Sequence, residues 1–340
     1  MESDDGHPEP YLEHHADIAS AERQAEIIEQ IWALYNAGVP LFTRDQLVTL
    51  EEQIATKPSV LEIPGMNDHK DWVADLQGLR EPRVHYRNIQ CLVNGLIPGE
   101  RMRIPTAFCS AYVGFFHPQI ISSSSDNDVE AVQTSFEEYE RAWLRSQTCQ
   151  SLTMMLSSVP LPKEVTKVVC FGLGELFPER EPSNSRRCTQ LAAALTMARV
   201  LNQRTGRSIR CYSQEPRYSQ VCRKVLGRLG FTVLDGAKGF LEVDNSTLVF
   251  TSCPDVPVKQ IVTELARPAM IIWNTAVPVE EERTEWELME WDGEKIMTAP
   301  YSTDPDSPRT RKMLQDEYTS YPFPEDLEHF SMLDIHVRKV

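Results

Sequence analysis

The stretch Lys167-Val-Val-Cys-Phe-Gly-Leu-Gly-Glu-Leu176 carries the strongest indication of the fold. Its run of valine, cysteine and phenylalanine has no polar alternation, which is typical of a strand covered on both faces of a sheet. Gly172 and Gly174 follow at once, and glycine lets the backbone turn sharply and come close to a ligand. With the amphipathic stretch over residues 190–201, the pattern predicts the ligand-binding edge of an open α/β sheet, although the third glycine of a full dinucleotide fingerprint is missing.

Strand and helix patterns alternate along the rest of this half of the chain. Short apolar runs predict the strands, and amphipathic runs at helical spacing predict the helices between them. The predicted strands lie at residues 208–212, 231–234, 247–250 and 269–273, and the predicted helices at residues 218–229 and 258–265. This alternation favours a Rossmann-like α/β fold with a mostly parallel sheet and right-handed crossovers, which we expect over residues 131–340.

Residues 1–130 are expected to form an amino-terminal helical and irregular extension. Apolar residues at helical spacing over 22–35 predict one helix. Thr43 and Ser135 each stand three residues before a glutamine or glutamate, a capping-box pattern that predicts a helix behind each of them. Several prolines and glycines within residues 58–130 predict irregular structure there.

Composition restricts the class of protein. A hydrophobic content of 41% is enough for a core, yet no apolar run approaches the length of a membrane span, so no membrane association is expected. The polar, acidic start shows no secretory signal. The eight cysteines are scattered without a C-X-X-C pair, so we expect no metal site and a reducing, cytoplasmic setting.

Charge is distributed unevenly along the chain. The formal net charge of −16 argues against a protein that coats nucleic acid such as DNA. Residues 179–229, however, contain eleven basic and three acidic residues, a local charge of +8. Arginine predominates there, and its planar fork suits phosphates, so this region is either an RNA-binding face or a solvated helix surface. The candidate RNA-binding residues are Arg186, Arg187, Arg199 and Arg207.

Polar residues follow the predicted strands at their carboxyl ends, where ligands bind in sheets of this kind. We expect several of them to line one pocket; the alternative is that they only begin loops. The carboxylates at this edge are Glu175, Glu215 and Asp255. The other candidates there are Gly172, Gly174, Ser252, Cys253 and Asn274.

Several short motifs resemble a known family, the sensitivity-to-red-light-reduced (SRR1-like) domain. They are Phe171-Gly-Leu-Gly174, Gln190-Leu-Ala192, Leu229-Gly230 and Cys253-Pro254. Two more resemble its fungal branch, Gly38-Val-Pro-Leu-Phe-Thr43 and Ile335-His-Val-Arg-Lys339. The branch includes arginine-containing cyclodipeptide synthases of fungal secondary metabolism, and their Asp-Asp-X-X-Glu motif has near matches at residues 126–130 and 281–285.

The resemblance implies a reaction and its partners. Such a synthase joins arginine to a second amino acid, takes both from charged transfer RNAs and releases a diketopiperazine. Because an aminoacyl ester is already activated, neither ATP nor another cofactor is expected. Glu175, Glu215 and Asp255 would pair with the arginine guanidinium or deprotonate the attacking amine. Ser252, Cys253 or Ser213 would be the nucleophile of any covalent intermediate, unless Cys253 is a buried structural cysteine.

Two other functions stay open. An S-adenosylmethionine-dependent methyltransferase would also place a glycine turn after its first strand, an acid after its second and a Pro-Asp near its fourth, and Glu215 and Asp255 fit that pattern. A noncatalytic regulatory protein of the same family is the third possibility.

Overall fold

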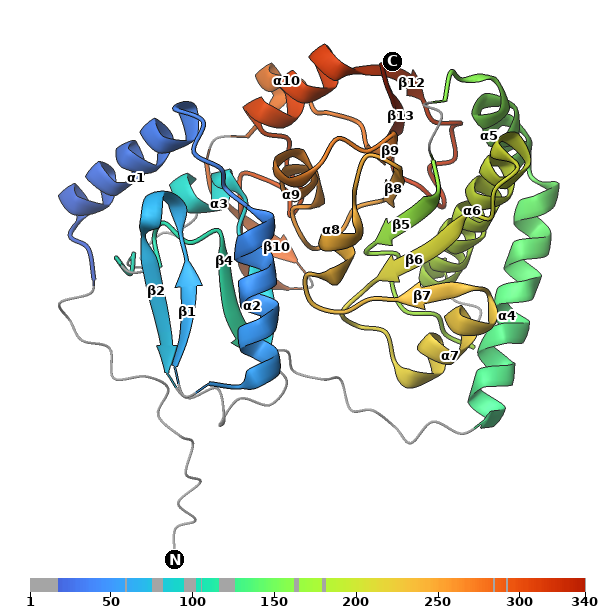
Figure 1. The fold of residues 1–340 in the computed structure, drawn as a ribbon, viewed down its shortest axis with the longest axis horizontal. Coiled ribbons are helices and arrows are strands. Elements are labelled where there is room, and N and C mark those ends of the chain that lie inside the picture. The colour runs from blue at the N-terminus through green and yellow to red at the C-terminus, as the bar shows by residue number, and fades with distance from the viewer. Residues whose placement is uncertain are drawn as a thin grey trace, which may run out of the picture.

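The computed structural model describes residues 18–58, 60–74, 82–94, 102–104, 106–115, 126–161, 165–178, 182–283, 285–291 and 293–339. A seven-stranded sheet in the order β12-β13-β9-β8-β5-β6-β7 forms its centre. Two small two-stranded sheets of the amino-terminal part, β1-β2 and β3-β4, stand beside it (Figure 1).

The central sheet is mostly parallel, as predicted for a Rossmann-like fold. Its strands are β5 Lys167–Phe171, β6 Arg210–Gln214, β7 Phe231–Val233, β8 Thr247–Thr251, β9 Met270–Asn274, β12 Tyr318–Pro322 and β13 Leu333–Arg338. Strands β5 to β9 pair in parallel, and β13 runs antiparallel to both β9 and β12. The five parallel strands confirm the expected alternation, with β6 beginning two residues later than predicted; β12 was not predicted.

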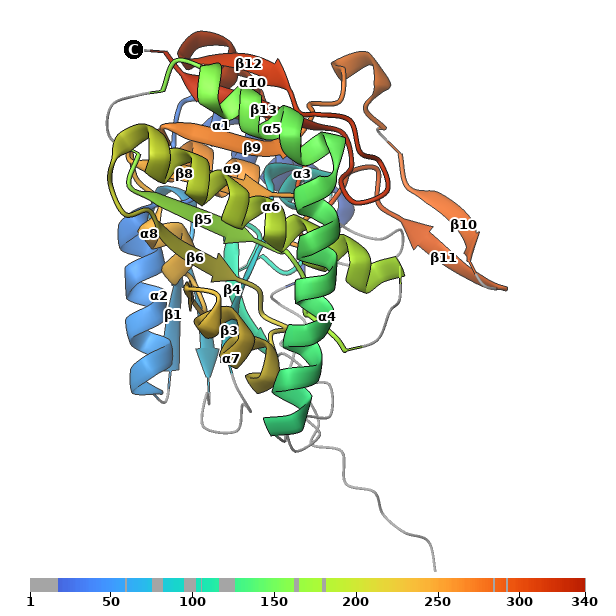
Figure 2. The same cartoon turned by 90° about the vertical axis from the view of Figure 1, so that its right-hand side faces the viewer.

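Helices cover both faces of this sheet. One group packs on the face turned to the viewer in Figure 2, and it consists of α4 Asp126–Arg145, α5 Gln147–Ser158, α6 Pro182–Thr205 and α7 Gln220–Arg228. The other face is covered by α8 Lys238–Glu242, α9 Val258–Leu265 and α10 Pro308–Glu317 together with the amino-terminal part. Within the described ranges no helix is both long and apolar enough to cross a membrane.

Strand β5 shows why two covering layers are needed. All five of its residues are buried. Val168 and Cys170 belong to the hydrophobic cluster with α4 to α7, whereas Val169 and Phe171 belong to the cluster on the opposite face. Because successive side chains of a strand point to opposite faces, an unbroken apolar run requires apolar partners on both.

The amino-terminal part is more regular than the sequence suggests. Its elements are α1 Ala21–Asn36, α2 Arg44–Thr56, β1 Val60–Pro64, β2 Lys70–Ala74, β3 Pro82–Tyr86, α3 Ile89–Asn94 and β4 Ala111–Phe115. The prediction of irregular structure over residues 58–130 was therefore wrong in this segment. Pro64 closes one strand and Pro82 opens another, and in such positions proline interrupts no ladder, so its presence did not exclude strands.

The two capping-box patterns had different outcomes. Thr43 caps α2, and Gln46 returns the bond to its backbone, which confirms the first pattern. Ser135 lies inside α4, is buried and receives a hydrogen bond from Asn184, so the helix start predicted behind it was wrong. The predicted border between residues 130 and 131 also falls inside α4, and the division into domains stays a prediction.

A short hairpin extends from the body of the molecule. It consists of β10 Glu287–Trp291 and β11 Glu294–Thr298, which pair antiparallel. Figure 2 shows it projecting beyond the central sheet. It follows the short 3-10 helix Val279–Glu281 and carries exposed acidic residues, and no strand was predicted there.

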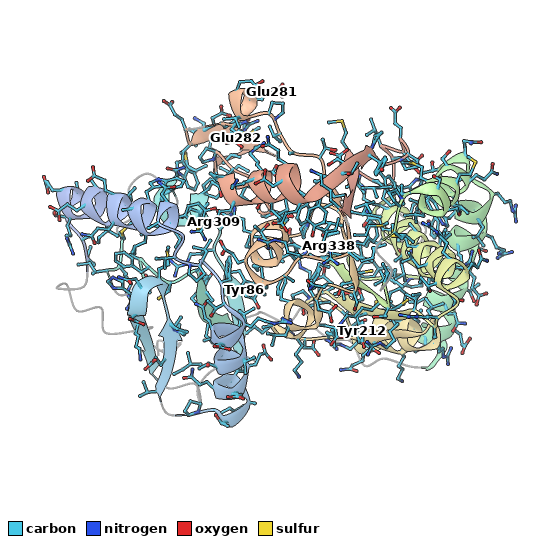
Figure 3. All side chains as sticks on the ribbon, turned by 45° about the horizontal axis from the view of Figure 1, so that its top comes forward. Tyr86, Tyr212, Glu281, Glu282, Arg309 and Arg338 are labelled. Carbon is cyan, nitrogen blue, oxygen red and sulfur yellow. The ribbon has the colours of Figure 1, made fainter. Side chains whose placement is uncertain are left out.

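Arg309 of α10 joins the amino-terminal part to the carboxyl-terminal half (Figure 3). Its Nη1 lies 2.6 Å from Glu264 Oε1, and its guanidinium carbon lies 3.9 Å from the centre of the Tyr35 ring. It also donates hydrogen bonds to the carbonyl oxygens of Tyr35 and Val39. Burial raises the pKa of Glu264, and the Arg309 charge opposes that rise.

We expect Arg309→Ala to lower the free energy of unfolding by roughly 2–3 kcal/mol, because it leaves a largely buried carboxylate and two carbonyls without their donor. Urea denaturation followed by circular dichroism measures the change. Lys312→Ala on the same helix is the matched control, since the Lys312–Asp316 pair is exposed and should contribute nothing measurable. Equal stability of both variants would contradict this account.

Candidate functional site

The turn after β5 requires glycine. Gly172 and Gly174 have φ angles of +66° and +77°, which L side chains rarely adopt. The Gly172 N–H donates to the Gln214 carbonyl at 3.1 Å, which links the turn to β6. A Cβ atom at Gly172 would lie 3.0 Å from the Cβ of Pro254, in the loop after β8. The turn is therefore enclosed by the loops of both neighbouring strands.

Arg187 lies across the same turn. A Cβ atom at Gly174 would lie 2.9 Å from Arg187 Nε. The Arg187 guanidinium donates to the Glu175 carbonyl at 3.3 Å and stands 5.1 Å above the Phe177 ring. Arg187 therefore supports the conformation of the turn through these contacts.

Glu215 follows β6 and Asp255 follows the end of β8. Because these two strands flank β5 in the sheet, the two acids approach the glycine turn from opposite sides. Arg217 stands between them. Its backbone N–H donates to Glu215 Oε1 at 2.9 Å, and its Nη2 lies 3.4 Å from Asp255 Oδ2. Burial raises the pKa of Glu215, and hydrogen bonds from the Arg217 and Gly174 backbones together with the Arg217 charge reduce that rise. Both predicted carboxylates thus contact Arg217, Glu215 at its backbone N–H and Asp255 at its guanidinium.

Glu175 has a different position from these two acids. Its Oε1 accepts a hydrogen bond from the Ser219 N–H at 3.2 Å. Ser219 is the N-cap of α7, so the carboxylate lies at the amino end of that helix, where negative charge is favourable. Glu175 therefore fixes α7 against the glycine turn.

Cys253, Asn274 and Ser331 form a third group at this edge. Cys253 is exposed, so the alternative of a buried structural cysteine was wrong, and its φ of +52° is strained for a residue with a side chain. Its N–H donates to Asn274 Oδ1 at 2.7 Å, and its Sγ lies 3.3 Å from both Asn274 Nδ2 and Ser331 Oγ. Ser252, by contrast, is buried.

Ser331 and its neighbours were missed by the sequence analysis. Strand β13 is antiparallel to β9 and begins opposite Asn274, so the loop before it returns over the carboxyl edge of the sheet. The residues that this loop adds are Asp326, His329 and Ser331, and His329 contacts Ser185 at the start of α6. Ser185 and His329 are 144 residues apart, and no spacing pattern relates them.

The four candidate RNA-binding arginines do not gather at one place. Arg186 and Arg187 lie in the first turns of α6, exposed Arg199 lies further along it, and Arg207 follows its end. A helix of this length extends about 36 Å at 1.5 Å per residue, which separates the first from the last. Only Arg186 and Arg187 lie at the carboxyl edge of the sheet.

Acids from other segments neutralise part of the local positive charge. The pairs involve acidic residues outside residues 179–229, which is why counting charge within that window overestimates the field. They are Arg217–Asp255, Arg223–Asp235 and Arg228–Glu130. Glu130, in the last pair, belongs to one of the near matches to the acidic motif, at residues 126–130. In the other, Glu282 pairs with Arg311 beside α10, on the outer side of the molecule (Figure 3).

Two further observations delimit the site. Among the described residues, no three His, Cys, Asp or Glu side chains gather as a metal-binding group. A shallow hollow of about 390 Å³ lies beside Arg44, Asn245 and Ala266, at the amino end of β8 and so at the opposite edge from the glycine turn. Arg44 there donates to the carbonyls of Leu241 and Val243, which gives it a structural role.

Comparison with known proteins adds a family relationship. A family model described as the SRR1 domain matches residues 132–337. Among solved structures, the chain is similar to the cofactor-bound Rv0187 from MTB, with 13% sequence identity and a TM-score of 0.33 over 61% of this chain and 89% of that chain. A search of curated proteins found no match.

The glycine turn can be tested with a matched pair of substitutions. Gly172 and Gly206 share a φ of +66°, but a Cβ atom at Gly206 would meet nothing within 4 Å. Gly206→Ala should therefore lower the free energy of unfolding by only roughly 1–2 kcal/mol, which is what a left-handed backbone conformation costs a residue with a side chain. Gly172→Ala should lose more unfolding free energy, because it adds the contact with Pro254. Equal losses in urea denaturation would show that close approach at Gly172 is unimportant.

The raised pKa of Glu215 predicts a pH dependence of stability. A carboxyl whose pKa is higher in the folded than in the unfolded state contributes fully to stability at a pH below its unfolded pKa. This contribution is lost as the pH rises through the folded pKa. Glu215→Gln should therefore be more stable than the parent at neutral pH, and the difference should shrink on acidification. Denaturation curves over a pH series measure this, with the exposed Glu29→Gln as control. A parent protein that is more stable than Glu215→Gln at neutral pH would contradict the expectation.

Proposed function

We propose that this chain, which belongs to the SRR1 domain family, is a transfer-RNA-dependent synthase that joins arginine to a second amino acid as a cyclic dipeptide. The proposal extends to fungal secondary metabolism and to a cytoplasmic setting, where charged transfer RNAs are made. The observation that carries it is the placement of Glu215 and Asp255 beside the glycine turn, with Glu215 on the Arg217 backbone N–H and Asp255 on the Arg217 guanidinium.

Arg217 indicates where a substrate arginine could bind. Its side chain is 60% exposed, and its 3.4 Å contact with Asp255 is loose for an ion pair. A substrate guanidinium could exchange with it and pair with Asp255. The loops after β6 and β8 hold Glu215 and Asp255 on both sides of β5, so the backbone of the glycine turn would contact the same substrate.

Glu215 is the better placed base of the two acids. General bases work best when their pKa lies near the working pH, and burial moves the pKa of Glu215 in that direction. It would take a proton from the α-ammonium of one aminoacyl group. The freed amine then attacks the ester carbonyl of the other aminoacyl group, forms the first peptide bond and releases a transfer-RNA hydroxyl. Attack by the remaining amine on the second ester closes the ring and releases the second transfer RNA.

The RNA would approach from the start of α6. Arg186 is exposed there, and its Nε donates to the Glu328 carbonyl at 3.4 Å, which places it beside the loop before β13. Phosphates of an acceptor stem attract such a charge even on an acidic protein, because local fields decide binding at close range.

We expect purified protein with precharged transfer RNAs to form an arginine-containing diketopiperazine without ATP, detected by mass spectrometry. Pretreatment with ribonuclease should abolish the product. Glu215→Gln should lower the rate by at least about 10²-fold, because the amide keeps the shape of the side chain but cannot accept the proton. Glu29→Gln, at an exposed position of α1, should keep full activity.

Three outcomes would contradict the proposal. Absence of any arginine-containing diketopiperazine across all second amino acids would exclude the synthase, and product that survives ribonuclease would exclude transfer RNA as donor. Without product, calorimetric binding of S-adenosylmethionine that Glu215→Gln abolishes would favour the methyltransferase, which needs an acid after β6. Neither product nor binding would favour a regulatory protein.

A further inference from the structure

Ser185, His329 and Asp326 form a continuous hydrogen-bonded chain. Ser185 Oγ lies 3.1 Å from His329 Nε2, and His329 Nδ1 lies 3.0 Å and 3.1 Å from the two oxygens of Asp326. We propose that these three residues are an acyl-transfer triad, in which Ser185 takes the acyl group of an activated ester. That the natural acyl donor is an aminoacyl ester of transfer RNA rests on the proposed function. The nucleophilic reactivity of Ser185 does not.

The histidine is held on two sides. The His329 N–H donates to Asp326 Oδ1 at 3.1 Å, and its carbonyl accepts a hydrogen bond from Gln190 Nε2 at 2.8 Å. Gln190 is buried in α6, the helix that carries Ser185. The loop that bears the base is thus bound to the helix that bears the nucleophile, and the geometry does not depend on one contact alone.

The hydrogen bonds also set the tautomer that the chemistry needs. A carboxylate can only accept, so Asp326 selects the tautomer with the proton on Nδ1. The lone pair of Nε2 then faces the Ser185 hydroxyl, as a general base requires. The side chains of His329 and Asp326 are 21% and 15% exposed, so their interaction is only partly screened by water.

Ser185 lies in the first helical turn of α6, a helix of 24 residues. The positive end of a helix favours an alkoxide or a tetrahedral oxyanion nearby. The serine is half-buried, and Phe177 before α6 and Leu327 and Met332 near His329 in sequence have exposed side chains. Phe177 is held there because its N–H donates to Asn184 Oδ1 at 3.0 Å.

The proposed step balances without a further reactant. Ser185 Oγ attacks the ester carbonyl carbon while His329 Nε2 takes the hydroxyl proton. The bond between this carbon and the leaving oxygen breaks, and His329 returns the proton to that oxygen. The products are an acyl-serine and a free alcohol. An amine or water then attacks the acyl-serine, with His329 as base, and restores the hydroxyl.

Within the described ranges, no histidine is hydrogen-bonded to the nucleophiles expected from the sequence. The hydrogen-bond partners of the Cys253 sulfur are Asn274 and Ser331, and neither is a base. Ser252 is buried, with 6% of its surface exposed, and Ser213 is fully buried and hydrogen-bonded to the Tyr218 hydroxyl. The structure thus assigns the nucleophile to a serine that the sequence analysis did not consider.

The test is acylation by p-nitrophenyl acetate, with release of nitrophenolate followed in a spectrophotometer and the acetyl group located by peptide mass spectrometry. The acetyl group should be on Ser185, and Ser185→Ala should abolish this burst. His329→Gln and Asp326→Asn should each slow acylation by roughly 10²–10⁴-fold, as loss of a base or of its orienting partner does. Ser157→Ala is the matched control, because Ser157 is an exposed helical serine whose hydroxyl donates to a backbone carbonyl.

Ser185→Cys keeps the proposal testable if the loop variants fail to fold, since it replaces only Oγ by Sγ. This variant should still be acylated, at the sulfur. Acetyl groups found only on other residues, or the same burst rate in His329→Gln, would overturn the triad. If Ser185 is acylated but no cyclic dipeptide forms, the proposed function fails and the triad stands. If cyclic dipeptide forms at an unchanged rate in Ser185→Ala, the assignment of an aminoacyl ester as the donor to Ser185 fails and the proposed function stands.

Discussion

Burial of β5 on both faces is the constraint on which the rest of the structure depends. Its alternating side chains, Val168 with Cys170 and Val169 with Phe171, enter two separate hydrophobic clusters. One cluster is closed by α4 to α7. The other is completed by residues of the amino-terminal part such as Ile31 and Phe42, with Arg309 joining the two regions. The amino-terminal part is therefore a covering layer that the sheet needs, because exposed apolar strand faces would be unstable in water.

The candidate site follows from the same arrangement. The central position of β5 places its glycine turn between the loops after β6 and β8, so Glu215 and Asp255 reach it from both sides. The antiparallel direction of β13 adds one more loop at this edge, since the strand must begin where β9 ends. In a fully parallel sheet that loop would lie at the opposite edge, and His329 could not contact Ser185. The reversed direction of β13 thus places the His329 imidazole beside Ser185 at the start of α6.

The electrostatics of this edge combine stabilising and reactive arrangements. Arg187 and Glu175 use their charges to hold the turn and α7, and Arg223 with Asp235 does the same further along. Glu215 is different, because burial raises its pKa and makes its ionised form costly to the fold. A folded protein that retains such a carboxylate next to an exposed ion pair has the features of a functional site, where stability is commonly lower than the fold allows.

Local signals in the sequence were sufficient for the parallel strands, the helices between them and the glycine turn, because apolar periodicity and positive φ are properties of a few neighbouring residues. They also placed Glu215 and Asp255 at strand ends. The strands β1 to β4 were missed since prolines at strand ends mimic loops, and Ser135 was misjudged because a capping box and a helix interior can share residues. The contact of Ser185 with His329 across 144 residues was decided by the tertiary structure alone, because it depends on strand order and direction, which no local pattern records.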